Sequence, residues 1–80
     1  MEITLALFGI TREIVGAPTL TLTTAPDQSV GGLLAHLRTT YPALTELRSL
    51  AVAVNNEYAH ADDRLRPHDE IALIPPVSGG

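Results

Sequence analysis

The residues with the most distinctive chemistry stand at the end of the chain, where an apolar run meets Pro75-Pro76 and then Val77-Ser78-Gly79-Gly80. Because proline has no backbone donor, strand pairing is predicted to stop at about Ile74. The prolines stiffen the exit, and glycine, which lacks a Cβ, can enter a slot too narrow for other residues. We therefore predict a domain over residues 1–75 and a tail over residues 76–80, with the Gly80 carboxylate as its reactive group. A frayed terminus is the alternative, but fraying explains neither the paired prolines nor the Gly-Gly ending.

The other side chains that could do chemistry are histidines and carboxylates, and we predict no site from them. They are His36, His60, His68, Asp62, Asp63, Asp69 and Glu70. Their spacing matches no metal-ligand motif, and the two acidic pairs are interpreted as solvated turn charges rather than as an acid/base pair. No glycine-rich phosphate loop follows a strand, so no bound nucleotide or other intrinsic cofactor is expected. Arg12-Glu13 either touches a partner or flanks the first loop, and the sequence leaves both open.

Composition limits the function classes. The 80 residues allow one domain, and with 45% apolar but only 4% aromatic residues its core must be aliphatic. A net charge of −4 argues against nucleic acid and anionic membranes as partners and favours a partner with a basic rim. No apolar run approaches a membrane span and no signal peptide is recognisable, so a cytoplasmic protein is expected. Without cysteine, any sulfur chemistry must use borrowed sulfur.

The elements that must position the tail are strands and one helix. Alternation of apolar and polar residues predicts strands over residues 2–8, 19–24 and 70–74, with the first two forming a hairpin pair. The apolar run 50–54 predicts another strand, followed by a tight turn at Asn55-Asn56 and a short return strand over residues 57–61. Residues 9–16 are long enough for a helical turn and are interpreted as a structured connection.

The single long helix is predicted to start after Ser29, a good N-cap, and to end at Pro42. Its apolar stripe follows helical spacing and consists of Val30, Leu33, Leu34, Leu37 and Tyr41. Gly31 and Gly32 in the first turn each cost about 0.5–1 kcal/mol relative to alanine, with no compensation visible in the sequence. Residues 43–48 are predicted to add a short helical turn.

These elements predict an α+β fold, a mixed sheet of four or five strands with one main helix on one face. The core is expected to join Ile3, Leu5, Leu7, Val52, Val54, Ile71 and Leu73 to Leu33, Leu34 and Leu37. The opposite face is expected to carry Ala6, Phe8, Ala51, Ala53, Ala72 and Ile74. Because a sheet face that meets water is normally polar, an apolar one indicates a protein interface, anchored here by Phe8 and Ile74. The alternative is that loops cover this face.

Taken together, the element order, the ending Ala72-Leu73-Ile74-Pro75-Pro76-Val77-Ser78-Gly79-Gly80, and the early Phe8, Arg12-Glu13 and Gly16 resemble the MoaD family of ubiquitin-like sulfur carriers. This family contains the small subunits of molybdopterin synthase. Asn56 and His68 stand where that family is expected to have glycine, and both residue types tolerate left-handed backbone.

The resemblance implies a β-grasp fold and a carrier cycle. An E1-like enzyme would use ATP to adenylate Gly80, and a sulfur donor acting through that enzyme would convert it to a thiocarboxylate. The tail residues Pro76, Val77, Ser78 and Gly79 would enter a large catalytic subunit within a heterotetramer, where the sulfur passes to cyclic pyranopterin monophosphate. The interface would use Phe8, Ile74, Ala6, Ala51, Ala53, Ala72 and Arg12. The chain itself would then be a non-catalytic sulfur donor.

Two alternatives stay open. The chain could carry sulfur for another pathway, such as thiamine, cysteine or tRNA thiolation, or it could be a ubiquitin-like modifier joined to lysines of other proteins. All five basic residues are arginines, which forbids chains linked through its own lysine side chains but not attachment to other proteins.

Overall fold

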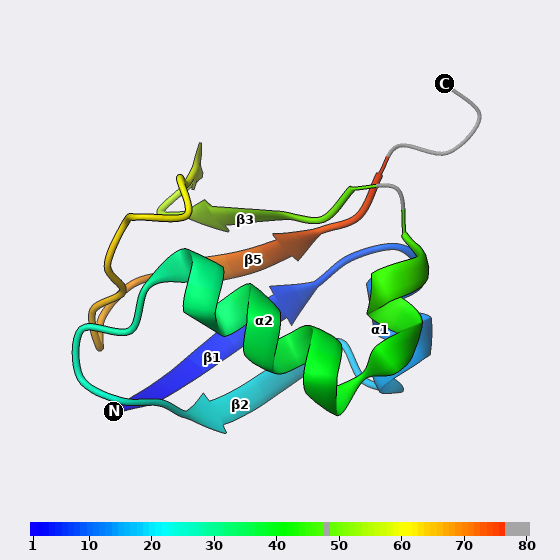
Figure 1. The fold of residues 1–80 in the computed structure, drawn as a ribbon, viewed down its shortest axis with the longest axis horizontal. Coiled ribbons are helices and arrows are strands. Elements are labelled where there is room, and N and C mark those ends of the chain that lie inside the picture. The colour runs from blue at the N-terminus through cyan, green and yellow to red at the C-terminus, as the bar shows by residue number, and fades with distance from the viewer. Residues whose placement is uncertain (48, 77–80) are drawn as a thin grey trace.

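The computed structural model describes residues 1–47 and 49–76 and contains one five-stranded sheet with one long helix on one face (Figure 1). In chain order the elements are β1 (Glu2–Leu7), α1 (Ile10–Val15), β2 (Thr19–Thr23), α2 (Val30–Thr40), the 3₁₀ helix η1 (Pro42–Glu46), β3 (Ala51–Val54), β4 (Glu57–Tyr58) and β5 (Ile71–Ile74). The predicted α+β architecture with a mixed sheet is therefore confirmed. No helix in the described part is long and apolar enough to cross a membrane.

The strand order is β2-β1-β5-β3-β4, and only the pair β1–β5 at its centre is parallel. Parallel strands end at the same edge of a sheet, and Figure 1 shows the arrowheads of β1 and β5 pointing the same way. The residues that follow β1 and the residues that follow β5 are thereby brought together, although they lie far apart in the sequence. This edge is where the predicted tail leaves the domain.

The core lies between the sheet and α2 and is aliphatic throughout. Its buried members are Ile3, Leu5, Leu7, Val30, Leu33, Leu37, Leu44, Val52, Leu65, Ile71 and Leu73. Two predicted members, Leu34 and Val54, are only partly buried and pack at its margin. Leu44 of η1 and Leu65 of the loop before β5 complete the core, because one helix is too short to cover both ends of the sheet.

Residues 9–16, interpreted from the sequence as a structured connection, form a short helix. They contain α1, which ends at Gly16 in left-handed geometry (φ 87°), with the Gly16 N–H bonded to the Arg12 carbonyl at 2.7 Å. Six residues are too few for an isolated helix to form in water, so packing stabilises α1, and a short periodicity cannot reveal that. The return strand β4 is likewise shorter than predicted, with two residues rather than five.

The turn between β3 and β4 has the predicted geometry. Asn55 and Asn56 both have positive φ angles, 53° and 70°, as a type I′ two-residue hairpin requires. Asn56 therefore replaces glycine at a position that needs left-handed backbone. His68 is not among the described residues with positive φ, so no glycine is needed there.

The structure supplies the reason for glycine at the start of α2 that the sequence does not show. The loop before β5 approaches the first turn so closely that a Cβ on Gly31 would lie 3.3 Å from the Ala61 Cβ. That approach lets the Ala61 carbonyl accept the Gly31 N–H at 3.0 Å, and the Asp63 carbonyl accept the Val30 N–H at 2.9 Å. Donors that a helix start normally leaves unpaired are thus satisfied by a loop.

Ser29 completes this capping as predicted, because its Oγ accepts the Gly32 N–H at 3.1 Å. We expect Ser29→Ala to lower the free energy of unfolding by about 1 kcal/mol through loss of the cap. Thr39→Ala is the matched control on the same helix: its exposed hydroxyl bonds only to the Ala35 carbonyl one turn earlier, and the expected change is within about 0.5 kcal/mol. Urea denaturation measures both. Equal effects of the two substitutions would contradict the capping role.

Candidate functional site

The candidate site is the sheet edge at which the tail begins. The residues predicted to enter a partner, Val77, Ser78, Gly79 and the reactive Gly80, lie outside the described residues. Pro75 and Pro76, here called the tail base, are described, and both are half-buried. Strand β5 ends at Ile74, directly before them, as the missing proline donors predict. The site can therefore be built from the surroundings of the tail base.

Gly9 lies directly against the tail base. Its backbone (φ 55°, ψ −133°) is of a kind that is essentially restricted to glycine. A Cβ at this position would lie 3.2 Å from the Pro75 Cγ, tighter than ordinary van der Waals contact. Gly9 is required both for the sharp turn after β1 and for room beside the Pro75 ring. The turn and the tail base consequently fix each other's position.

Thr11 holds the residue before this turn. Its side chain is fully buried, and its Oγ1 accepts the Phe8 N–H at 3.0 Å and donates to the Phe8 carbonyl at 2.6 Å. The backbone of Phe8 is thereby clamped while the residue stays 48% exposed. The sequence did not predict this role, because a single threonine at the start of a short helix gives no signal of its burial.

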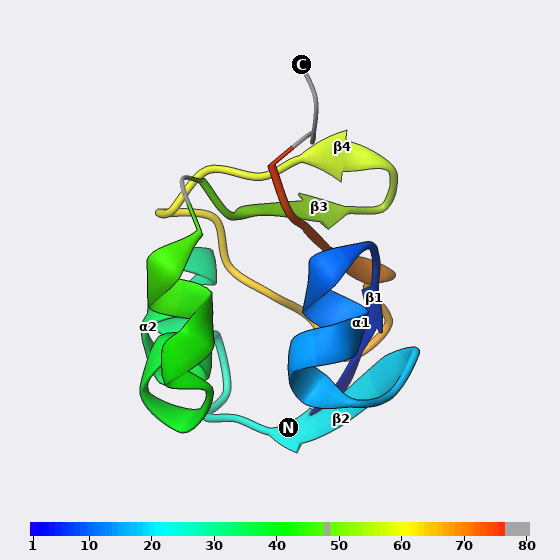
Figure 2. The same cartoon turned by 90° about the vertical axis from the view of Figure 1, so that its right-hand side faces the viewer.

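Strand register places the predicted interface residues on one side of the sheet, away from α2. We call this side the open face. Figure 2 shows α2 on the other side of the sheet and α1 at the end of the strands, so among the described residues no helix covers the open face. Ala6, Ala72 and Ala53 are register partners on β1, β5 and β3 and form one row across the sheet. Ala51 pairs with Ile74 in the next row.

Only half of the open face is apolar. The apolar patch consists of Ala6, Phe8, Ala51, Ala53, Ala72 and Ile74 and covers β3, β5 and the end of β1. On β2 and the start of β1 the same face carries exposed threonines, and the Thr4 and Thr21 hydroxyls are 3.2 Å apart in a hydrogen bond. The apolar patch is thus confined to the half that adjoins the tail base. Its role as an interface stays a prediction.

Arg12 lies near the tail base but not on the open face. It is exposed on α1 and lines, with Gly9, Glu13 and Pro18, a shallow surface hollow of about 500 Å³. Because Gly9 belongs to this hollow and also touches the tail base, Arg12 is placed where a partner that receives the tail would pass. Contact between Arg12 and a partner remains a prediction.

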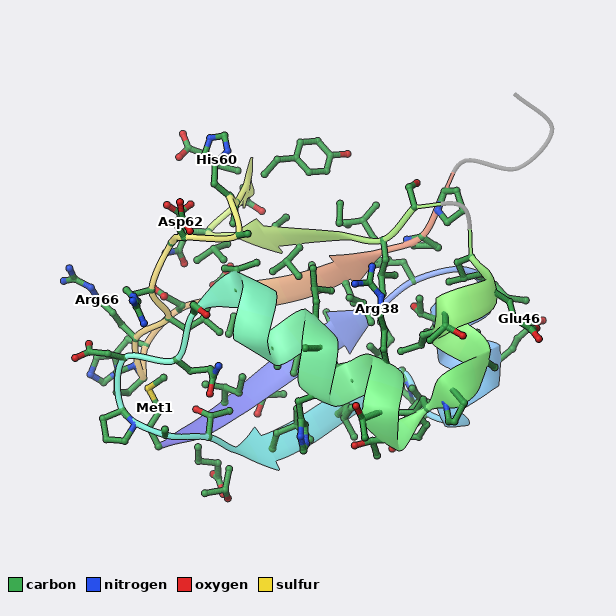
Figure 3. The ribbon with its side chains drawn as sticks, in the orientation of Figure 1. Met1, Arg38, Glu46, His60, Asp62 and Arg66 are labelled. Carbon is green, nitrogen blue, oxygen red and sulfur yellow. The ribbon has the colours of Figure 1, made fainter. Side chains whose placement is uncertain are left out.

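His60 and the nearby acidic pair Asp62-Asp63 belong to another part of the molecule. Figure 3 shows His60 and Asp62 at the end opposite to the tail base. The Asp63 carboxylate accepts the His60 N–H at 2.9 Å, and the Asp69 carboxylate accepts the Arg66 N–H at 2.8 Å, so these acids cap turns, as interpreted from the sequence. Within residues 1–47 and 49–76 no three histidine or acidic side chains are close enough to hold a metal ion.

Comparison with known proteins shows where this fold and tail recur. The model of a family described as the ThiS family matches residues 5–80. A molybdopterin synthase sulfur carrier subunit from Arabidopsis thaliana is 40% identical over all of this chain and 84% of that protein. Both matches include strands β2 to β5, α2 and the Gly-Gly ending, so they concern most of the arrangement described above.

Solved structures share the β-grasp fold that the resemblance implied. Small archaeal modifier protein 1 (SAMP1) from Haloferax volcanii has a TM-score of 0.82 and 30% identity, with all of both chains covered. A chain from a complex of subunits 1 and 2 of the molybdopterin-converting factor of Helicobacter pylori has a TM-score of 0.67 and 23% identity, again over the full length of both chains. The second likeness is one of fold.

The contact between Gly9 and the tail base can be tested by substitution. We expect Gly9→Ala to lower the free energy of unfolding by about 1–3 kcal/mol, because alanine must adopt a backbone region reserved for glycine and press on Pro75. The control is Gly16→Ala, since Gly16 also has positive φ but a Cβ added there would meet nothing within 4 Å; its expected cost is about 1 kcal/mol. Urea denaturation measures both variants.

A second readout separates the contact from backbone strain. The NMR amide resonance of Ile74, next to the tail base, is expected to shift in Gly9→Ala and to stay in place in Gly16→Ala. An unmoved Ile74 resonance in Gly9→Ala would show that the turn after β1 does not position the tail base.

Proposed function

The chain belongs to the ThiS family, and we propose that it is the sulfur-carrier subunit of a molybdopterin synthase with the Gly80 carboxylate as its reactive group. Its relative of that name matches the entire chain at 40% identity. The observation in the structure that supports this role most is the position of the tail base at the rim of the apolar patch. One surface can therefore hold a partner while the tail reaches into it.

Chain geometry limits how far the reactive group can act. Four residues after Pro76, fully extended, span at most about 14 Å. The partner's reaction centre must then lie within that distance of the tail base, on the side of the apolar patch. The stiff prolines of the tail base set the direction in which the tail leaves the domain. The glycines at the end of the tail have no side chain and therefore suit a narrow channel.

The proposed cycle gives the carboxylate a reactivity that it lacks by itself. An E1-like partner uses ATP to form an acyl adenylate at Gly80 with release of pyrophosphate. The terminal sulfur of a persulfide on the donor then displaces AMP and gives an acyl disulfide. A second thiol of the activating partners attacks the donor sulfur of this disulfide, forms a new disulfide there and releases a thiocarboxylate, an anionic sulfur nucleophile on a chain without cysteine. The large synthase subunit uses this sulfur to build the dithiolene on cyclic pyranopterin monophosphate. We place this cycle in the cytoplasm.

We assign the catalytic groups to the partners. Two of the candidate acid/base side chains, His60 and Asp62, lie at the far end of the domain from the tail base. Arg12 is the charged residue best placed to meet a partner beside the tail. In the proposed assembly, two carriers and two large subunits form a heterotetramer, and each carrier contributes a tail and an apolar patch but no reaction centre.

The likeness to a small archaeal modifier protein makes protein conjugation the second candidate. Both functions begin with the same acyl adenylate and differ in the nucleophile, sulfur for a carrier and a lysine amine for a modifier. The full-length match to a named sulfur carrier favours the first function over the second and over carriers of other sulfur pathways. The product formed from the adenylate, thiocarboxylate or amide, separates the candidates.

The proposal predicts that activation requires a free carboxylate on Gly80. Adding one alanine after Gly80 is expected to abolish activation by the E1-like partner, because the carboxylate then stands on the wrong residue. Thermal unfolding is expected to be unchanged, since strand pairing ends at Ile74. The rate of pyrophosphate release, which reports adenylate formation, measures the effect. Normal activation and sulfur transfer by the extended chain would contradict the assignment of Gly80.

The apolar patch predicts a second outcome. Phe8→Ala is expected to weaken binding to the large subunit by roughly 30-fold, because truncating a buried aromatic anchor often costs about 2 kcal/mol. Stability should change little, because Phe8 is 48% exposed in the isolated chain. Ile10→Ala is the matched control: Ile10 is 43% exposed and apolar but lies on α1. Calorimetric titration measures both, and a Phe8→Ala affinity equal to that of the unsubstituted chain would remove Phe8 from the interface.

A further inference from the structure

The apolar patch contains a small hollow with a specific shape. The hollow has a volume of about 220 Å³ and is lined by Ala6, Phe8, Ala53, Asn56, Glu70, Ile71 and Ala72. Its floor is the row of three alanines that crosses β1, β5 and β3 in register. Larger side chains stand at both ends, Phe8 near the tail base and Glu70 at the start of β5. We call this feature the alanine hollow.

Glu70 is held in place by its backbone, which leaves its carboxylate free to bind. The Asn55 Oδ1 accepts the Glu70 N–H at 3.0 Å, and the Glu70 carbonyl accepts the Asn55 N–H at 2.8 Å. The Asn55 side chain is fixed in turn by the Asp69 carboxylate at 3.0 Å. Glu70 itself is exposed. The backbone at Glu70 is therefore fixed before any partner arrives, which reduces the backbone share of the ordering cost of binding.

The charge on the open face has one sign. Ile3 and Ile71 are buried against α2, so by strand alternation Glu2 and Glu70 lie on the open face. The remaining positions of this face on the described strands are alanine, threonine, isoleucine and tyrosine. Only Glu70 of the two glutamates lines the alanine hollow. A complementary partner surface must bring positive charge to this end of the apolar patch.

We propose that the alanine hollow receives one long basic side chain, lysine or arginine, from the partner that binds the open face. Its aliphatic stem would lie on the alanine floor, and its cationic head would meet Glu70. Glu70 stands two residues from Ala72 along the strand, about 6.6 Å, a span that a lysine or arginine stem can cover while its head stays polar. The exposed Phe8 ring at the other end closes the hollow.

This inference rests on the proposed function, because it takes the large synthase subunit as the partner. It adds the chemistry of recognition: apolar contact holds the patch, and one charge pair at Glu70 sets the orientation. An ion pair that is partly shielded from water contributes more than an exposed one, and electrostatic complementarity chiefly selects the right partner. If the carrier bound the large subunit through the same patch but in the reversed orientation, Glu70 would not meet its basic side chain.

The experiment is a calorimetric titration of the large subunit with Glu70→Gln at low and high salt. We expect binding to weaken about tenfold at low ionic strength, and the deficit to shrink as salt screens the lost pair in the unsubstituted chain. Glu70→Lys should weaken binding further by repulsion. Glu2→Gln is the matched control, the same change on the same face outside the alanine hollow, with affinity expected within about twofold of the unsubstituted chain.

A second variant tests the floor. Ala72→Leu fills the hollow and is expected to weaken binding by a factor that does not depend on salt, because it blocks the stem rather than the charge. Thermal unfolding of each variant shows that the domain is intact. The combined result supports the proposal only if Glu70→Gln is sensitive to salt and Ala72→Leu is not.

Several outcomes would overturn the inference. Equal weakening by Glu70→Gln and Glu2→Gln would mean that net charge alone matters, and unchanged affinity of Glu70→Gln would mean that no basic side chain reaches it. Self-association of the isolated chain that Glu70→Gln abolishes would assign the hollow to a second copy. If the unsubstituted chain does not bind the large subunit, the proposed function fails and this inference fails with it, whereas binding without a Glu70 effect removes only the inference.

Discussion

Parallel pairing of β1 with β5, in the register Leu5–Ile71, Ala6–Ala72 and Leu7–Leu73, brings the turn after the first strand to the tail base. Parallel neighbours cannot be joined by a tight turn, so the intervening chain must cross over the sheet, and α2 does so while burying one face. The other face is left open beside the tail base. Site, core and open face all follow from this one pairing.

One face of the strands stabilises the core, and the other is available to a partner. Isoleucine, leucine and valine side chains on one side fill the core under α2. The alanine side chains on the other side are small, so they project little from the sheet. Gly9 and Thr11 join the faces at the sheet edge, because Gly9 makes room for Pro75 and Thr11 fixes the backbone of the exposed Phe8. Stability and recognition are therefore separated by the alternation of side chains along each strand.

Most of the fold could be predicted because its signals are local. Alternation located β1, β2 and β5, Ser29 and the stripe from Val30 located α2, and paired prolines located the tail base; the family resemblance drawn from that ending is confirmed. Features that depend on distant contacts could not be predicted: α1 needs packing to form, Gly31 is explained only by the approach of Ala61, and Thr11 is recognisable only once buried. The roles of Gly80 and of the apolar patch stay predictions.

In the proposed function, this chain delivers sulfur from its C-terminal carboxylate to a reaction carried out by another chain. Intact-mass spectrometry of the thiocarboxylated protein, mixed with the large subunit and pterin substrate, tests this directly. We expect the mass gained by replacing one oxygen with sulfur to be lost once for each sulfur transferred, and only when the large subunit is present. Sulfur transfer by the purified thiocarboxylate protein alone, as fast as in the two-protein mixture, would contradict it.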